Sequence, residues 1–204
     1  MGLLKSIHAE FKHCIEEARD CTNSAHEYSN QNDVNKNFIY NIYEISFLKV
    51  FTGWEAFLEN SFIAYMSGAT SKKSKPRLYL KKINKDHALK ILCGTLEYPD
   101  WTKIEEVRTL AKLYFIKGGP FLLPLKEIEV YYNEMKKIRN AIAHISENAK
   151  EKFYSLVKAK LPVFRQDICP GELLCNRISS RQRKIFFEHY INFLEIAANK
   201  IMRT

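Results

Sequence analysis

Residues 139–144, with the sequence RNAIAH, hold the side chains best suited to chemistry in this chain of 204 residues. His144 belongs to the residue type that most readily accepts and donates protons near neutral pH. Arg139 offers a permanently charged, planar fork that fits the oxygens of a phosphate group. Asn140 precedes His144 by four residues, so on a helix it can orient the imidazole or a bound phosphate. These residue types point to a site that holds a phosphate and transfers a proton.

A long helix is expected to carry this run, because apolar residues recur at helical spacing from Pro124 onward. Its core face should contain Leu125, Ile128, Tyr132, Met135, Ile138, Ile142 and Ile145. Its polar face should contain Asn133, Lys137, Asn140 and His144. His144 should therefore point away from the core, and the small Ala141 and Ala143 leave room for an RNA strand or a second helix. Across a twofold axis, two copies of this face would join two histidines and two arginines in one cleft.

Two strings in the sequence resemble the HEPN family of helical proteins. RNAIAH at 139–144 resembles the HEPN motif, in which an arginine, often followed by a polar asparagine, precedes a histidine by a few residues on one bundle helix. FTGWEAFLE at 51–59 is similar to the second helix of the HEPN group called RiboL-PSP. The resemblance implies a homodimer whose facing motif helices build one endoribonuclease site, as in many toxins and defence proteins of bacteria and archaea. Arg139, Asn140 and His144 would be the catalytic residues of that site.

The chemistry of these residues agrees with cleavage of RNA without a metal. Such cleavage needs a base that removes the 2′-hydroxyl proton, a cation that steadies the charged phosphorane, and an acid that protonates the leaving 5′ oxygen. His144 is expected to transfer the protons and Arg139 to hold the phosphorane. The products would carry a 2′,3′-cyclic phosphate and a 5′-hydroxyl. No metal or other cofactor is expected, and the sequence contains no Gly-rich phosphate loop.

Simpler roles remain open for the same residues. His144 can lie near a helix C-terminus, where a basic ring complements the helix dipole. Arg139 can pair with Glu134 or with a neighbouring helix. The protein would then be a non-catalytic HEPN module that binds RNA or a protein partner in a toxin–antitoxin or defence complex.

Two further residues are expected to support the motif. Lys137 shares the polar face of the motif helix. Glu55 follows Phe51 by four residues and precedes Leu58 by three, which aims its carboxylate into an otherwise apolar face. Such a carboxylate seeks a charged partner, for which Arg139 is one candidate; it can equally extend to solvent or bond to Trp54 or a tyrosine hydroxyl.

The composition predicts an all-α protein, because glycine (7) and proline (6) are few and helix-forming residues abound. We expect an up-and-down helical bundle with additional short helices, formed by one domain over 1–204. Ser179 and Gln182 have the spacing of a capping box and should begin the last helix. The other helices are expected over 3–28, over 38–66, after Asn84, over 105–116, over 124–145 and over 146–160. The first should end in the polar stretch 28–37 and carry Cys14 and Cys21 on its core face, and the core face of the second should include Ile42, Ile45 and Leu48.

The charge and the cysteines bear on partners and location. The net charge of +9 favours phosphate-bearing partners, and the basic stretch after residue 71 is the expected RNA-binding surface. The five cysteines are odd in number and form no CxxC pair, and no signal peptide or membrane span is recognised, which favours a soluble protein of the reducing cytoplasm. The expected partners are RNA, a second copy of the chain, and an antitoxin or defence protein, with no membrane. The RNA-binding residues of that stretch are Lys72, Lys73, Lys75, Lys81 and Lys82.

Overall fold

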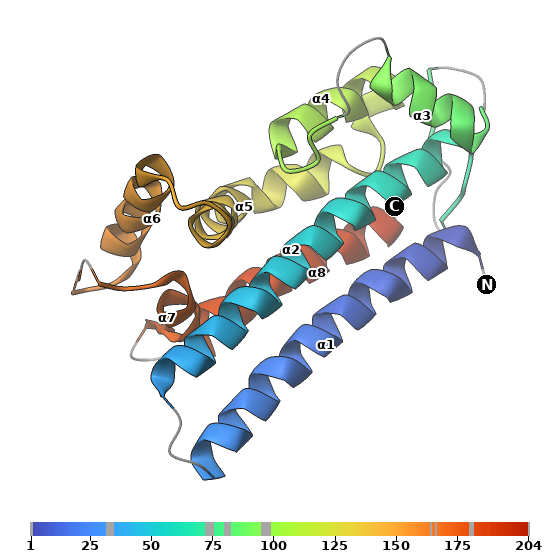
Figure 1. Cartoon of the computed structure of the whole chain (residues 1–204). Helices are drawn as coiled ribbons and strands as arrows, with labels where there is room; N and C mark the ends of the chain where they lie inside the picture. Colours follow the sequence, from blue (N-terminus) through green and yellow to red (C-terminus); the bar gives the residue numbers. More distant parts are fainter. Residues whose placement is uncertain are drawn as a thin grey trace. The chain divides into compact units, whose positions relative to one another are not determined.

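The computed structural model describes residues 2–31, 35–71, 76–79, 83–94, 99–163, 165, 167–179 and 182–203. It is mostly helical (78%) and belongs to the all-α class. Within the described ranges, no helix is both long enough and apolar enough to cross a membrane. The helices, labelled in Figure 1, are α1 (Leu3–Gln31), α2 (Lys36–Met66), α3 (Lys85–Cys93), α4 (Ile104–Tyr114), the 3-10 helix η1 (Ile116–Gly118), α5 (Leu122–Ala143), α6 (Glu147–Lys160), α7 (Pro170–Cys175) and α8 (Phe186–Arg203).

The ends of several helices follow from local chemistry that the sequence already contains. Asn84 caps α3, because its side-chain oxygen accepts a hydrogen bond from the His87 N–H at 2.8 Å. Ser146 caps α6 in the same way, accepting from the Ala149 N–H at 3.3 Å. α1 ends at Gln31, inside the polar stretch expected to stop it. The expected helices over these parts of the chain are confirmed.

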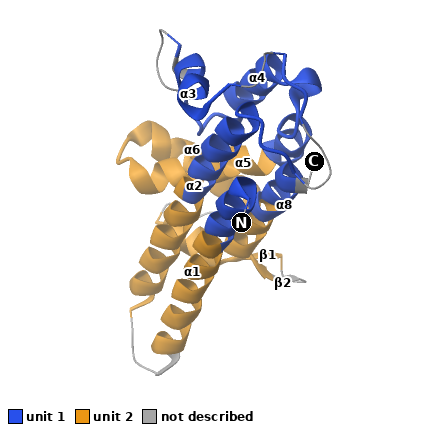
Figure 2. Cartoon of the chain, turned by 90° about the vertical axis from the view of Figure 1, so that its right-hand side faces the viewer, with its two compact units in different colours: residues 1–12, 53–129, 194–204 blue, residues 13–52, 130–193 orange. Residues whose placement is uncertain are grey.

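The chain divides into two compact units, coloured blue and orange in Figure 2. Unit 1 comprises Met1–Lys12, Gly53–Glu129 and Leu194–Thr204, and unit 2 comprises His13–Thr52 and Val130–Phe193. Helices α1, α2, α5 and α8 each contribute residues to both units. The expectation of one domain over 1–204 stays a prediction.

The core of unit 1 is built around the aromatic ring of Phe62 on α2. Its centroid lies 4.9 Å from that of Phe121 and 5.0 Å from that of Phe115, and the Trp101 ring meets it edge-on at 5.7 Å. The Tyr65 hydroxyl donates a hydrogen bond to the carbonyl of Ile201 at 2.8 Å, which ties α2 to the end of α8. The large rings thus join segments that are distant in the sequence.

The core of unit 2 joins α1, α2, α5 and α8. The Phe51 and Tyr132 rings stack at 5.3 Å, and the Tyr43 ring meets that of Phe187 edge-on at 5.1 Å. α7 packs against α2 through Gly171, whose N–H donates to a carboxylate oxygen of Glu44 at 2.8 Å. A side chain at position 171 would collide with the backbone of α2. Glycine is therefore required by the close approach of the two helices.

The expected capping box at Ser179 and Gln182 is wrong. These two residues face each other in a small antiparallel hairpin of β1 (Arg177–Ser179) and β2 (Gln182–Ile185). The hairpin uses the backbone groups that the capping box would have needed, so α8 begins only at Phe186.

The face of α2 that is buried in unit 2 also differs from the expectation. Ile45, expected on the core face, is 64% exposed, whereas Tyr43 and Phe47 are buried. This part of α2 carries apolar residues on several sides, so periodicity alone does not select one face. Cys21, expected in the core, is exposed, and the neighbouring Thr22 is buried instead.

Candidate functional site

The RNAIAH run lies at the end of α5, in unit 2 (Figure 1). Met135 and Ile138 on α5 are fully buried and anchor this part of the helix to the core. α5 ends at Ala143, and the His144 N–H makes the last helical hydrogen bond, to the carbonyl of Asn140 at 2.9 Å. His144 is exposed, as its expected direction away from the core requires.

The expected continuation of this helix to Ile145 is wrong. Ile145, assigned to the core face, lies after the end of the helix and is 97% exposed. The cause is Ser146, which has the extended backbone conformation of an N-cap (φ −103°, ψ 144°). The chain must leave the helix before this cap, so residues 144–146 form a tight connection between α5 and α6.

The guanidinium of Arg139 brings the three motif side chains together. Its Nη1 lies 3.2 Å from Oδ1 of Asn140 and 3.2 Å from Nε2 of His144. Nη1 carries two hydrogens, one for each acceptor. An arginine can only donate, so Nε2 of His144 is the acceptor in this contact.

The expected alternative pairing of Arg139 with Glu134 is not observed. Glu134 instead forms an ion pair with Lys160 on α6, at 2.6 Å, and accepts a hydrogen bond from the Tyr190 hydroxyl at 3.0 Å. Among the described residues, no carboxylate lies within ion-pair distance of Arg139. The guanidinium therefore keeps its positive charge uncompensated by a local acid, which suits it to an anionic ligand.

The Glu134 contacts were not anticipated from the sequence, yet they fix the scaffold behind the motif. They join α5, α6 and α8 within unit 2. Burial, together with the adjacent Glu134 carboxylate, raises the pKa of Tyr190 and keeps its hydroxyl protonated as a donor. Burial and the nearby Lys184 and Lys160 lower the pKa of His189 on the same helix. These partners come from separate helices, so no spacing in the sequence reveals them.

The structure bears differently on the supporting residues. Lys137 is half-buried on α5, close in sequence to the motif, and forms no ion pair within the described part of the chain. Glu55 is half-buried on α2 in unit 1, whereas the motif belongs to unit 2, so its contact with Arg139 stays a prediction. The expected RNA-binding residues Lys72, Lys73, Lys75, Lys81 and Lys82 lie outside the described residues.

The arrangement at the end of α5 can hold a phosphate and accept or return a proton at a surface open to large substrates. Over the ranges that the structure describes, no group of three or more His, Cys, Asp or Glu side chains could hold a metal ion. No known protein family matches the chain, and neither a curated protein nor a solved structure matches it. The resemblance to HEPN proteins therefore rests on the two sequence strings alone.

Proposed function

We propose that the chain is a metal-independent endoribonuclease of the HEPN type, with an up-and-down helical bundle and its catalytic residues at the end of α5. One observation carries this proposal: the Arg139 guanidinium contacts both the half-buried Asn140 and the exposed His144. A charge that binds phosphate and a base that transfers protons are thereby held within one hydrogen bond of each other.

In the proposed reaction the 2′-oxygen of a ribose attacks the adjacent phosphorus, and the bond from phosphorus to the 5′ oxygen breaks. When a phosphate draws the guanidinium of Arg139 toward its own oxygens, Nε2 of His144 loses its donor and is free to take the 2′-hydroxyl proton. Arg139 then steadies the charge of the phosphorane, and Asn140 helps to hold the guanidinium in place. The leaving 5′ oxygen receives a proton, which yields a 2′,3′-cyclic phosphate and a 5′-hydroxyl.

The second proton transfer is assigned to a second copy of the chain. Each chain contributes one motif histidine, whereas the reaction needs a base and an acid at the same phosphate. Ala143 is small and exposed, and the exposed Ile145 adds an apolar surface at the same end of α5. These features support a twofold contact between motif helices, which would place two arginines and two histidines in one cleft.

A toxin or antiphage role in the cytoplasm follows from this proposal, with RNA as substrate and an antitoxin or defence protein as a further partner. The net charge of +9 supports binding to RNA. The alternative is a non-catalytic HEPN module that binds RNA or a protein. It is favoured by the fact that Arg139 and His144 satisfy each other's hydrogen bonds, which a purely structural motif would also do.

Cleavage of a mixed-sequence RNA in excess EDTA tests the proposal. We expect the unsubstituted protein to cleave, and the His144→Ala variant to lose about 10²-fold or more in rate with unchanged thermal stability, because general acid–base catalysis supplies that much. His87→Ala is the matched control, since the His87 side chain is exposed on α3 and forms no hydrogen bond or ion pair with the described part of the chain.

The product ends and the outcome pattern complete the test. New 3′ ends that resist phosphatase before acid treatment and lose their phosphate to it afterwards would identify the cyclic phosphate. Equal cleavage by the protein and its His144→Ala variant contradicts the proposal. Absence of cleavage in both, with RNA binding retained, identifies the binding module instead.

A further inference from the structure

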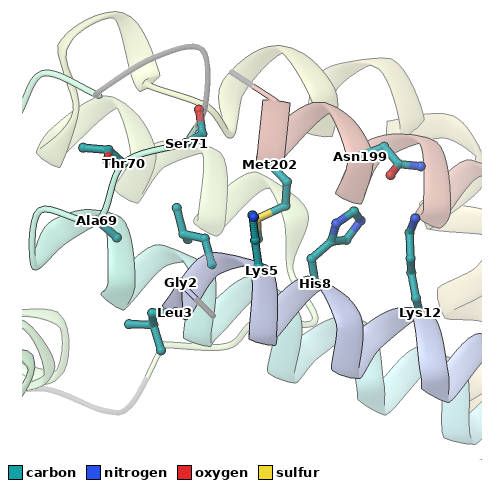
Figure 3. A pocket seen from close by; sticks show the side chains of 11 residues that line it. Gly2, Leu3, Lys5, His8, Lys12, Ala69, Thr70, Ser71, Asn199 and Met202 are labelled. Carbon is teal, nitrogen blue, oxygen red and sulfur yellow. The ribbon is translucent and has the colours of Figure 1, made fainter.

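Unit 1 contains a cavity that the proposed nuclease chemistry does not use. Its volume is about 730 Å³, within the range of roughly 300–1,000 Å³ of small-molecule sites. Three segments line it: the first turns of α1, residues 69–71 after α2, and the last turns of α8. Figure 3 shows the side chains of these segments gathered around one space.

One wall of the cavity is basic. Lys5, His8 and Lys12 follow one another at spacings of three and four residues, so they share one face of α1. In Figure 3 all three side chains extend from α1 toward the helix that carries Asn199 and Met202. Lys5 and Lys12 lie about 10 Å apart along the helix axis, from a rise of 1.5 Å per residue.

Nothing acidic balances this wall within the cavity. The described residues that line it include no Asp or Glu. No carboxylate of the described chain lies within ion-pair distance of the ammonium groups of Lys5 and Lys12. Two lysines that face a cavity without a counter-charge favour an anionic ligand.

The backbone adds to the same preference. Gly2, Leu3 and Leu4 line the cavity where α1 begins, and the first turn of α1 contains no acidic residue. The N–H groups of Lys5 and Ser6 donate to the Gly2 carbonyl, so within the described residues those of Leu3 and Leu4 are left to carry the positive end of the helix dipole. Thr70, Ser71 and Asn199 add uncharged hydrogen-bonding groups to the lining. An anion near Lys5 can therefore be held by an ammonium group together with backbone amide donors at the start of α1.

The rest of the lining is aliphatic. Leu3, Leu4, Ala69 and Met202 contribute its apolar surface, and the lining within the described ranges includes no Phe, Tyr or Trp. Nucleobases are usually held by stacking on such rings, whereas leucine and methionine adapt to flexible aliphatic chains. From this division we infer that the cavity binds a phosphate monoester carried on an aliphatic body, with the phosphate at Lys5 and Lys12 and the chain against Leu4 and Met202.

Octyl phosphate, used below its micelle concentration, is the probe for this site. Isothermal titration of the full chain should show saturable binding of one molecule per chain, with affinity falling as salt is raised. Inorganic phosphate and 1,2-octanediol, which carry only one half of the ligand each, should bind at least about tenfold more weakly.

The double variant Lys5→Ala/Lys12→Ala should weaken octyl phosphate binding by about tenfold or more, because each lysine supplies a charge-assisted hydrogen bond. Lys112→Ala/Lys126→Ala is the matched control, as it removes the same charge from exposed positions of unit 1 outside the cavity. Met202→Asn should weaken octyl phosphate but leave inorganic phosphate unchanged. Thermal melts of all variants verify folding.

Several results would overturn the inference. These are the absence of saturable binding, equal binding by the cavity variant and its charge control, and tighter binding of uridine monophosphate than of octyl phosphate. Binding to phosphatidate vesicles without binding of monomeric octyl phosphate would also overturn it, since a membrane surface rather than the cavity would then supply the contacts. None of these readouts depends on RNA cleavage, so this inference and the proposed nuclease succeed or fail separately.

Discussion

The end of α5 and the start of α1 both gather basic side chains around a histidine, yet they do so at opposite ends of a helix. At the end of α5, Arg139 and His144 meet on an open surface through a contact of 3.2 Å. At the start of α1, Lys5 and Lys12 line a cavity, and neither forms an ion pair with the described part of the chain. The first region is organised by side-chain hydrogen bonds, and the second by the space that it encloses.

The helix dipole explains why the two regions suit different tasks. The C-terminus of α5 presents carbonyl oxygens and stabilises basic groups, so Arg139 and His144 are held there before any ligand arrives. The N-terminus of α1 presents N–H groups that reinforce the lysines in attracting an anion. Prior positioning is what a reaction requires, whereas a binding site gains most from uncompensated charge and from volume.

The largest expected difference between the regions concerns the exchange of arginine and lysine. Arg139→Lys should reduce RNA cleavage about 10²-fold, because an ammonium lacks the further nitrogens that can hold phosphate while Nη1 stays on Asn140. Lys5→Arg should change octyl phosphate affinity by less than about threefold, because the cavity requires a charge rather than a fixed geometry. Single-turnover cleavage and calorimetry measure the two effects. If the Arg139→Lys variant cleaves RNA within about threefold of the rate of the unsubstituted protein, the end of α5 needs only a positive charge, as the cavity does.

A smaller effect is expected from the helix caps, one in each unit. Ser146→Ala and Asn84→Ala should each lower the free energy of unfolding by about 1 kcal/mol, the usual contribution of a cap. Only Ser146→Ala should also slow RNA cleavage, by several-fold, because Ser146 ends the turn that holds His144. Urea unfolding and cleavage rates of the two variants make the comparison. If both variants slow cleavage equally, the turn has no special role.

The smallest effect concerns Glu44, a half-buried carboxyl in the unit that carries the motif. Burial raises the pKa of Glu44 above its ordinary value of 4.5, in opposition to the hydrogen bond from the Gly171 N–H. Because its pKa is raised in the folded state, the protonated Glu44 carboxyl favours folding, and this contribution is fully present below pH 4.5. The contribution is lost as the pH rises through the folded-state pKa. Glu44→Gln keeps an acceptor for Gly171 and should stabilise the protein at pH 7 by at most about 1 kcal/mol, since the carboxyl is only half-buried.

Thermal melts over about pH 3.5–8, roughly the range in which carboxyl groups titrate, check this expectation. The difference in melting temperature between Glu44→Gln and the unsubstituted protein should vanish at the acid end of the range and grow toward neutral pH. Glu17→Gln is the opposite control, because a hydrogen bond from Lys49 lowers the pKa of Glu17, which lies on the surface of the same unit. A constant gap across the range would show that the Glu44 charge does not matter.

Most helices were predictable from the sequence, and their faces and ends were less so. Apolar spacing located α1, α2 and α5, and the starts expected after Asn84 and at Ser146 agree with the observed caps of α3 and α6. The hairpin of β1 and β2 was missed because Ser179 and Gln182 satisfy a helix-capping pattern equally well. Ile45 was assigned to the wrong face because burial on α2 depends on which neighbours are present.

The candidate site divides along the same line. Spacing was sufficient to select Arg139, Asn140 and His144 and to predict that His144 faces away from the core. It was not sufficient to show that Nη1 of Arg139 contacts both partners, because that depends on where α5 stops. The cavity of unit 1 left no signal at all, since its lining comes from residues 2–12, 69–71 and 199–202.

The sequence by itself determined the all-α class, the positions of most helices, the basic charge and the choice of motif residues. These properties depend on composition and on contacts within a few residues of the chain. Only the tertiary structure decided which faces are buried, that Glu134 pairs with Lys160 rather than with Arg139, and that a cavity with a basic wall exists. Those properties depend on contacts between segments that are distant in the sequence, and the spacing of residues within one segment does not reveal such contacts.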